Sequence, residues 1–149
     1  MASVRNEATS HVRWGLAKRV LLIDREIWNR DSIAADLSRE GCDVIAVGNP
    51  VEALQTLSEE AFDLVIVDLA FPDAATHGGG VVWEDFLVLQ RLQRAGAPPF
   101  IATSSEGDQF RTQSLDAGAR DFLHKPFSPE RLVQSIERVC TPFPQPALK

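Results

Sequence analysis

The sequence predicts an α/β protein built on a five-stranded parallel sheet with helices on both faces. Short apolar runs alternate five times with segments of helical period, which is typical of a doubly wound parallel sheet. The runs are rich in branched residues and nearly unbroken, as in strands buried on both faces. With 149 residues, 44% of them hydrophobic and 24% charged, the chain has the size and composition of one globular domain.

Each predicted strand is an apolar run too short for a helix. The runs are RVLLID, DVIAV, DLVIVD, PFIAT and DFL, at residues 19–24, 43–47, 63–68, 99–103 and 121–123. Each run is followed by turn residues or by a helix-start signal, which places the strand ends.

The first two predicted helices cover residues 28–40 and 50 to about 60. Gly41 is a C-terminal stop for the first, while Asn49 and Pro50 predict an N-cap and a first-turn proline for the second. Their expected inner faces are formed by Ile33 and Leu37, and by Val51, Leu54 and Leu57.

Three more helices are predicted in the second half. One runs from about Trp83 to near Gly96, a short one ends before Gly118, and the last begins after the N-cap Ser128 and Pro129. Their expected inner faces include Phe86, Leu89 and Leu92, and then Leu132, Ile136 and Val139. We expect a domain over 19–140, with tails at 1–18 and 141–149 and a Gly-rich loop at 69–80.

Composition argues against several classes of function. A net charge of −6 makes nucleic acid an unlikely main partner, because phosphate binding favours a basic face. The chain has no apolar run of membrane-spanning length and no apolar signal core at its N-terminus, so we expect a cytoplasmic protein. Cys42 and Cys140 lack metal-ligand spacing and are read as reduced thiols.

Polar residues follow four of the predicted strands. Asp24 ends the first strand, Asp68 ends the third, Ser104 follows the fourth and Lys125 lies just after the fifth. In open parallel sheets, sites form beyond the C-terminal strand ends, so we expect these side chains to converge at one edge. A carboxylate can attack phosphorus, and an ammonium and a hydroxyl can stabilise the incoming phosphoryl oxygens.

Four motifs occur in order along the chain: LLID, DLVIVDLAFPD, IATSS and GARDFLHKPFSPERL. With these motifs, residues 19 to 140 resemble the receiver domain of bacterial two-component response regulators. The resemblance implies a flavodoxin-like (βα)5 fold with strand order 2-1-3-4-5. It implies Asp68 as phospho-acceptor, Ser104 as switch hydroxyl and Lys125 as the phosphoryl-binding lysine. It also implies Phe122 as the switch aromatic and a cis peptide bond before Pro126.

The sequence departs from the family at the acidic pair after the first strand, which reads Asp24-Arg25. Asp24 and Glu26 are candidate metal ligands, but Arg25 replaces the second carboxylate, so Mg²⁺ is a candidate cofactor with weakened binding. Three interpretations stay open. Arg25 substitutes for the metal beside Asp68, or it points to solvent while Mg²⁺ binds weakly, or the site is no longer phosphorylated.

We therefore expect a signalling protein and not an enzyme, a receiver in a phosphorelay. Asp68 would take a phosphoryl group from a histidine kinase or phosphotransfer partner and switch a face that binds a downstream protein. A second copy of the chain is a further candidate partner. The alternative is a degenerate receiver that binds proteins without phosphorylation. A flavodoxin-like enzyme or nucleotide binder fits the fold but lacks a glycine loop after the first strand.

Overall fold

The computed structural model describes residues 16–69, 83–94, 96–106 and 110–141, without the side chains of 83–87. The strands are β1 (Arg19–Ile23), β2 (Asp43–Val47), β3 (Leu64–Asp68), β4 (Phe100–Ser104) and β5 (Asp121–His124). The helices are α2 (Ile27–Arg39), α3 (Pro50–Glu59), α5 (Trp83–Leu92), α6 (Arg111–Asp116) and α7 (Pro129–Cys140). The expectations for the N-terminal tail up to residue 15, the loop from 70 to 80 and the tail from 142 fall outside the described residues, and so does that for the side chain of Phe86.

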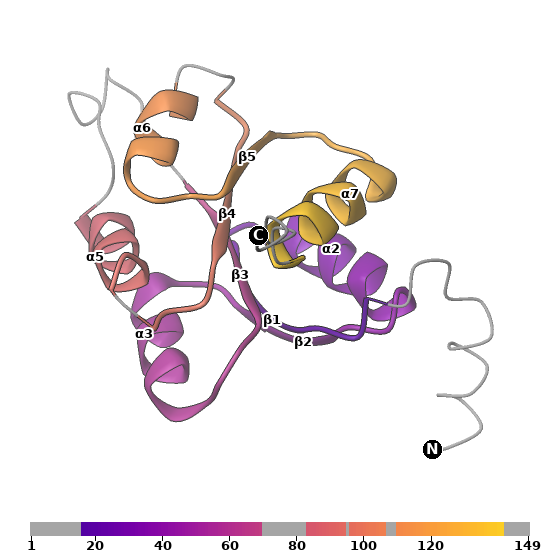
Figure 1. Cartoon of the computed structure of the whole chain (residues 1–149), viewed down its shortest axis with the longest axis horizontal. Coiled ribbons are helices and arrows are strands. Elements are labelled where there is room, and N and C mark those ends of the chain that lie inside the picture. Colours follow the sequence, from indigo (N-terminus) through magenta and orange to yellow (C-terminus); the bar gives the residue numbers. More distant parts are fainter. Residues whose placement is uncertain (1–15, 70–82, 95, 107–109, 142–149) are drawn as a thin grey trace, which may run out of the picture.

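The five strands form one parallel sheet in the order β2-β1-β3-β4-β5. Helices α3, α5 and α6 lie on one side of the sheet, and α2 and α7 lie on the other (Figure 1). The predicted fold class, strand order and alternation are confirmed. Because all strands are parallel, their C-terminal ends meet at one edge of the sheet.

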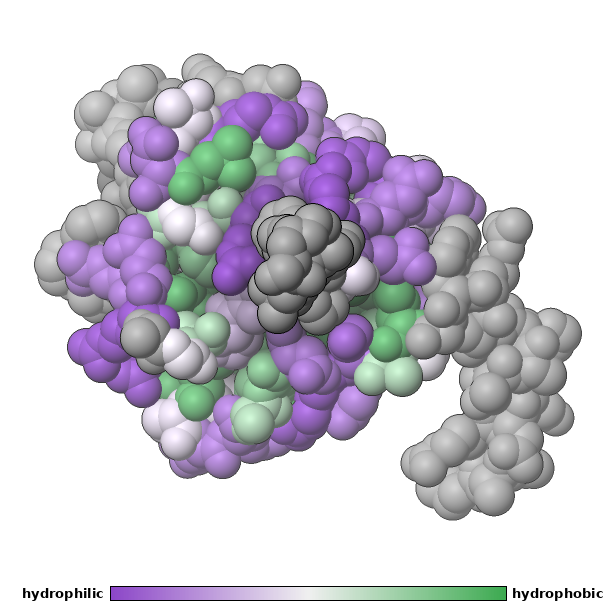
Figure 2. Space-filling model, viewed as in Figure 1, coloured by the Kyte–Doolittle hydropathy of each residue, from purple (hydrophilic) through white to green (hydrophobic). Residues whose placement is uncertain are grey.

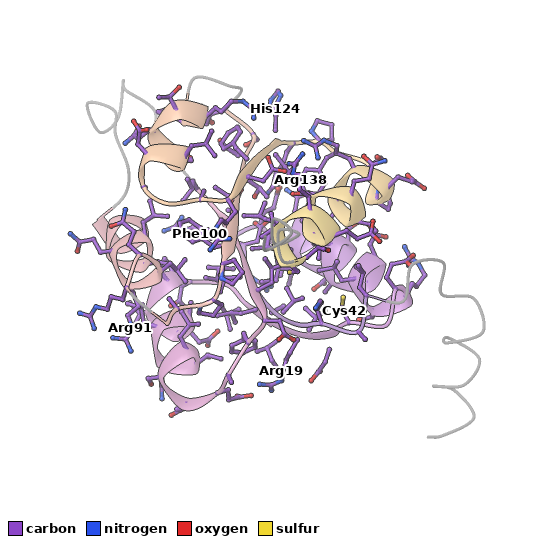
Figure 3. All side chains as sticks on the ribbon, in the orientation of Figure 1. Arg19, Cys42, Arg91, Phe100, His124 and Arg138 are labelled. Carbon is purple, nitrogen blue, oxygen red and sulfur yellow. The ribbon has the colours of Figure 1, made fainter. Side chains whose placement is uncertain are left out.

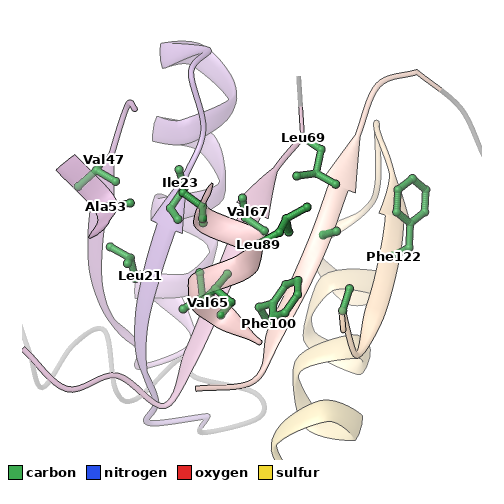
Figure 4. Close-up of a cluster of buried hydrophobic side chains, with 14 residues drawn as sticks. Leu21, Ile23, Val47, Ala53, Val65, Val67, Leu69, Leu89, Phe100 and Phe122 are labelled. Carbon is green, nitrogen blue, oxygen red and sulfur yellow. The ribbon is translucent and has the colours of Figure 1, made fainter. Parts of the chain in front are cut away.

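Each face of the sheet has its own core. The face under α3, α5 and α6 includes Leu21, Val65, Val67, Phe100 and Phe122 (Figure 4). The face under α2 and α7 takes the alternate strand positions, namely Val20, Leu22, Leu64, Ile66, Ile101 and Leu123. Strand side chains alternate between faces, so odd and even positions of each strand separate into the two cores.

Local signals in the sequence account for the helix ends. The Asn49 side chain accepts a hydrogen bond from the Glu52 backbone N–H (2.8 Å), and Ser128 accepts one from the Arg131 N–H (3.0 Å). Such caps satisfy amide groups that have no partner within the helix. Gly41 ends α2 with a positive φ of 89°, a conformation that costs glycine little.

One residue of a predicted inner face is wrong. Val51 is 64% exposed, whereas Ala53 on the same helix is completely buried. Successive helical residues are about 100° apart, so two positions separate Val51 from Ala53 by about 160° around the axis. The buried stripe of α3 runs through Pro50 and Ala53, with Leu54 and Leu57 packed at its margin. The predicted inner residues of α2 and α7 are confirmed as buried or partly buried.

The face of the molecule seen in Figure 2 is mostly hydrophilic around its rim, with hydrophobic residues showing in patches between the hydrophilic ones. Both cysteines are free thiols. Within the part of the chain that the structure describes, no helix is long and apolar enough to cross a membrane.

Candidate phosphoryl-acceptor site

Four polar residues continue one face of the sheet past its apolar core. Asp24, Asp68, Thr103 and Lys125 each lie two positions after a residue of the core under α2 and α7. Strand alternation therefore directs all four side chains to the same side, at the edge where the parallel strands end. Asp68 and Thr103 are also direct partners in the β3–β4 register.

Lys125 binds both carboxylates of the pocket. Its Nζ lies 2.7 Å from Asp24 Oδ2 and 2.9 Å from Asp68 Oδ1. Asp24 is buried, and the Lys125 and Asp68 side chains are 10% and 13% exposed. Three ionisable groups thus share one nearly closed space, with two negative charges and one positive charge when all are ionised.

Burial and the neighbouring charges shift the pKa values of Asp68 and Lys125. Burial raises the pKa of the Asp68 carboxyl; Lys125 opposes this rise and Asp24 adds to it, so the pKa lies above its ordinary value. Burial lowers the pKa of the Lys125 amine, but Asp68 and Asp24 raise it by more. Lys125 is therefore a permanent cation at neutral pH, as a phosphoryl-binding group needs to be.

The sequence analysis missed Thr103. This buried residue donates a hydrogen bond from Oγ1 to Asp68 Oδ1 at 3.1 Å. The signal was present in the sequence, because Thr103 shares the strand face of Ile101 whereas Ser104 falls on the opposite face. Counting alternate positions along PFIATS finds it.

Ser104, the predicted switch hydroxyl, is also buried at the end of β4. Its Oγ accepts a hydrogen bond from the Glu106 backbone N–H (3.0 Å), which holds the loop after β4. Its role toward a phosphoryl group stays a prediction. The hydroxyl that contacts Asp68 in this structure is that of Thr103.

The turn after β1 carries the unusual Arg25. The Glu26 backbone N–H donates to Asp24 Oδ1 (2.9 Å), and Arg30 Nη1 donates to the Asp24 carbonyl oxygen (3.0 Å). Gly48 leaves room for the guanidinium of Arg30, since a Cβ at position 48 would lie 2.5 Å from Arg30 Nη1. Arg25 itself is exposed at the turn.

The donor set does not fit an ordinary Mg²⁺ site. Hard cations take several oxygen ligands, but both pocket carboxylates already bind Lys125 and a cation stands at position 25. The Glu26 carboxylate accepts a hydrogen bond from the Asn29 amide instead. Among the described residues, no group of three acidic, histidine or cysteine side chains could hold a metal ion.

The remaining predicted residues lie close to this edge. The peptide bond between Lys125 and Pro126 is cis. Phe122 lies completely buried on the opposite sheet face, in the core under α6 (Figure 4), with the Arg111 guanidinium 5.1 Å from its ring centroid. A groove of about 360 Å³ opens beside Lys125 between α2 and the segment after β5, lined in part by Ser32, Ser105 and Phe127.

The chain belongs to the response regulator receiver domain family, whose model matches residues 20–137. Proteins of this family act in signalling with histidine kinases and downstream targets, and generally use Mg²⁺ for phosphorylation.

Several similar curated proteins are transcriptional regulators. The chain is 30% identical over 132 residues to the probable transcriptional regulator ycf27 of Cyanophora paradoxa, covering 88% of this chain and 52% of that protein. It is 33% identical over 120 residues to GltR of Pseudomonas aeruginosa, covering 80% and 48%. The chain spans about half the length of the curated relatives it matches.

Solved receiver structures have the same fold. The Francisella response regulator 1452 receiver domain aligns with a TM-score of 0.69 at 21% identity, covering 83% of this chain and 96% of that one. The chemotaxis response regulator CheY4 of Vibrio cholerae aligns with a TM-score of 0.67 at 25% identity, covering 81% and 97%.

Proposed function

We propose that Asp68 accepts a phosphoryl group from the phosphohistidine of a histidine kinase or phosphotransfer protein and passes the signal to a downstream protein in the cytoplasm. The observation that carries this proposal is the 2.9 Å contact between Lys125 Nζ and Asp68 Oδ1 at the C-terminal sheet edge. It places a cation beside a carboxylate that is still partly open to solvent.

The transfer forms a bond between phosphorus and an Asp68 oxygen as the bond between phosphorus and the imidazole nitrogen breaks. The electron pair of the broken bond stays on the imidazole, which takes up a proton. The incoming oxygens bring negative charge close to Asp24, and Lys125, which bridges both carboxylates, offsets it. In this proposal Ser104 then exchanges its Glu106 contact for a phosphoryl oxygen, and Phe122 repacks.

We further propose that Arg25 supplies the positive charge that a metal ion supplies in other receivers. A guanidinium can bind phosphoryl oxygens through two parallel hydrogen bonds. Arg25 follows Asp24 directly in the chain and is exposed in the turn after β1. The poor fit of the donor set to Mg²⁺ supports this interpretation over weak metal binding.

Incubation with acetyl phosphate, with and without Mg²⁺, tests the proposal by intact mass. We expect the mass of one phosphoryl group on the wild-type chain at similar rates in both conditions, and none on Asp68→Asn. Labelling only with Mg²⁺ would reject the role of Arg25 while keeping that of Asp68.

Substitution of Arg25 should change the metal requirement. We expect Arg25→Asp to make labelling at least about tenfold faster with Mg²⁺ than without it, because a third hard oxygen ligand joins Asp24 and Asp68. Arg94→Asp makes the same charge change in the exposed segment just after α5 and serves as the matched control, with no new Mg²⁺ dependence. Equal rates for Arg25→Asp in both conditions would contradict the expectation.

A second candidate function is protein docking without phosphorylation. Trp28, in the first turn of α2 three residues after Arg25, is 79% exposed, and its neighbour Ile27 is also exposed. Large exposed apolar side chains at a site edge favour a protein partner. Absence of label with every phosphodonor tried, with and without Mg²⁺, would favour this function.

A further inference from the structure

The turn after β1 is held by a guanidinium that comes from α2. Arg30 is half-buried, and its Nη1 donates to the Asp24 carbonyl oxygen at 3.0 Å. The Asp24 backbone N–H donates to the Val47 carbonyl oxygen (3.1 Å), and Asp24 Oδ1 accepts from the Glu26 backbone N–H (2.9 Å). Both backbone polar groups of Asp24 therefore have a partner, and Arg30 supplies the one for the carbonyl.

The space for this guanidinium lies over Gly48, the first residue after β2. A Cβ at position 48 would lie 2.5 Å from Arg30 Nη1 and 3.4 Å from Arg30 Cζ, and its nearest atoms beyond its chain neighbours would all belong to that guanidinium. Gly48 does not have a positive φ, so its backbone conformation is open to other residues. The glycine at this position is therefore explained by the guanidinium of Arg30 and not by the backbone.

The hydrogen bond from Arg30 reaches Arg25 through the backbone. The peptide unit that carries the Asp24 carbonyl also carries the Arg25 N–H, and this unit is planar. A donor that holds the carbonyl therefore fixes the plane from which the Arg25 side chain extends. An arginine side chain loses much rotamer freedom when it is held in one place. A guanidinium that substitutes for a metal ion therefore gains from a fixed backbone.

We propose that Arg30 is a positioning residue for Arg25, that it acts through the Asp24 carbonyl oxygen, and that Gly48 serves to leave room for it. This inference rests on the proposed function, in which Arg25 binds phosphoryl oxygens in place of a metal ion. Arg30 stands on a rigid element, because its backbone N–H donates to the Glu26 carbonyl oxygen (2.9 Å) in the first turn of α2. The helix thus holds the donor, and the donor holds the turn.

The test measures the rate at which acetyl phosphate labels the chain without Mg²⁺, by intact mass. Arg30→Met keeps the apolar stem and removes the donors, whereas Gly48→Ala keeps every charged residue and pushes the guanidinium off the carbonyl. We expect each variant to label about fivefold more slowly than wild type, because a misplaced binding group costs rate. The double variant should be no slower than the slower single one, since both changes break one contact. If Arg30→Met folds poorly, Gly48→Ala still tests the contact.

Arg39→Met is the matched control, because it makes the same change in the last turn of the same helix, where the Arg39 side chain is 66% exposed. It should label at the wild-type rate.

A second comparison separates positioning from a merely structural role. In an Arg25→Gln chain, adding Arg30→Met should leave the labelling rate unchanged, because the residue that Arg30 positions is gone. A further fall in that chain would overturn the inference, and so would a wild-type rate for Arg30→Met or Gly48→Ala alone. Wild-type chain that takes no label without Mg²⁺ would overturn the proposed role of Arg25 and this inference with it, a result distinct from the others.

Discussion

Asp68 and Asp121 are two carboxylates on the same face of the sheet, and they differ in how their charge is balanced. Their side chains are similarly buried, at 13% and 9% exposed. Asp121 accepts hydrogen bonds from the Phe122 backbone N–H (2.8 Å) and from Ser135 Oγ (2.6 Å). It accepts a third from the guanidinium of Arg138 on α7 (Figure 3). Asp68 shares a single lysine with Asp24.

The difference separates a structural charge from a reactive one. Both oxygens of Asp121 are engaged, and Arg131 lies 3.8 Å from one of them as a second cation. Asp121 therefore carries one negative charge and has two positively charged side chains beside it, those of Arg138 and Arg131. The pocket of Asp68 has one cation for two anions, so it is short of positive charge. Burial alone would not distinguish the two residues; the local charge balance does.

Removal of the shared lysine should have the largest effect. Lys125→Met leaves Asp24 and Asp68 buried without a cation, and we expect a loss of about 3 kcal/mol in the free energy of unfolding, the range for a broken buried ion pair. Urea denaturation at pH 7 measures it. Adding Asp24→Asn should restore part of the loss, because it removes one of the two stranded charges. A loss below about 1 kcal/mol would contradict the charge count.

The Asp121 cluster should be next. Asp121→Ala leaves the buried Ser135 hydroxyl without its partner, but Arg138 is 62% exposed and can turn to water. We expect a loss of about 2 kcal/mol in the free energy of unfolding. Phosphodonor labelling of Asp68 in the folded variant should be unchanged. A large fall in labelling would show that the two carboxylates are not independent.

Asp68→Asn should have the smallest effect and the opposite sign. The raised pKa of Asp68 means that its charged form is disfavoured in the folded state, so its ionisation costs stability at pH values above the folded-state pKa. We expect the variant to be about 1 kcal/mol more stable than wild type at pH 7. The gain should shrink as pH falls through the raised folded-state pKa and vanish below the ordinary aspartate pKa of 3.8, where wild-type Asp68 is protonated in both states.

Urea denaturation of Asp68→Asn across that pH range is the measurement, and Asp121→Asn is the control. Asp121→Asn should lose stability at pH 7, because it weakens the ion pairs with Arg138 and Arg131. If both substitutions changed the free energy of unfolding at pH 7 in the same direction, the contrast between the two carboxylates would be contradicted.

Most of the fold could be predicted from the sequence, because the strands are continuous apolar runs and the helix ends carry local signals such as Asn49 and Ser128. The face of α3 was predicted wrongly at Val51, because a three-residue recurrence of apolar side chains is compatible with more than one helix face. Tertiary packing against the sheet chooses the face centred on Ala53.

The sequence predicted which site residues lie at the strand ends, but not on which face of the sheet each side chain lies. The rule that parallel strands end at one edge predicted the meeting of Asp24, Asp68 and Lys125. It did not separate Thr103 from Ser104, since that requires the strand face as well as the edge. The hydrogen bonds of Glu26 to Asn29 and of Arg30 to the Asp24 carbonyl depend on side-chain rotamers in a turn, which no pattern in the sequence encodes.

The two neighbouring hydroxyls of β4 point to opposite layers of the protein. Thr103 is held against the nucleophile, and Ser104 is held against the loop that leads to α6. Side chains along a strand change face at every residue. Inserting or deleting one residue within β4 would therefore turn Thr103 away from Asp68 and turn Ser104 toward it. Evolution can therefore vary the identity of residues along this strand more freely than it can vary their number.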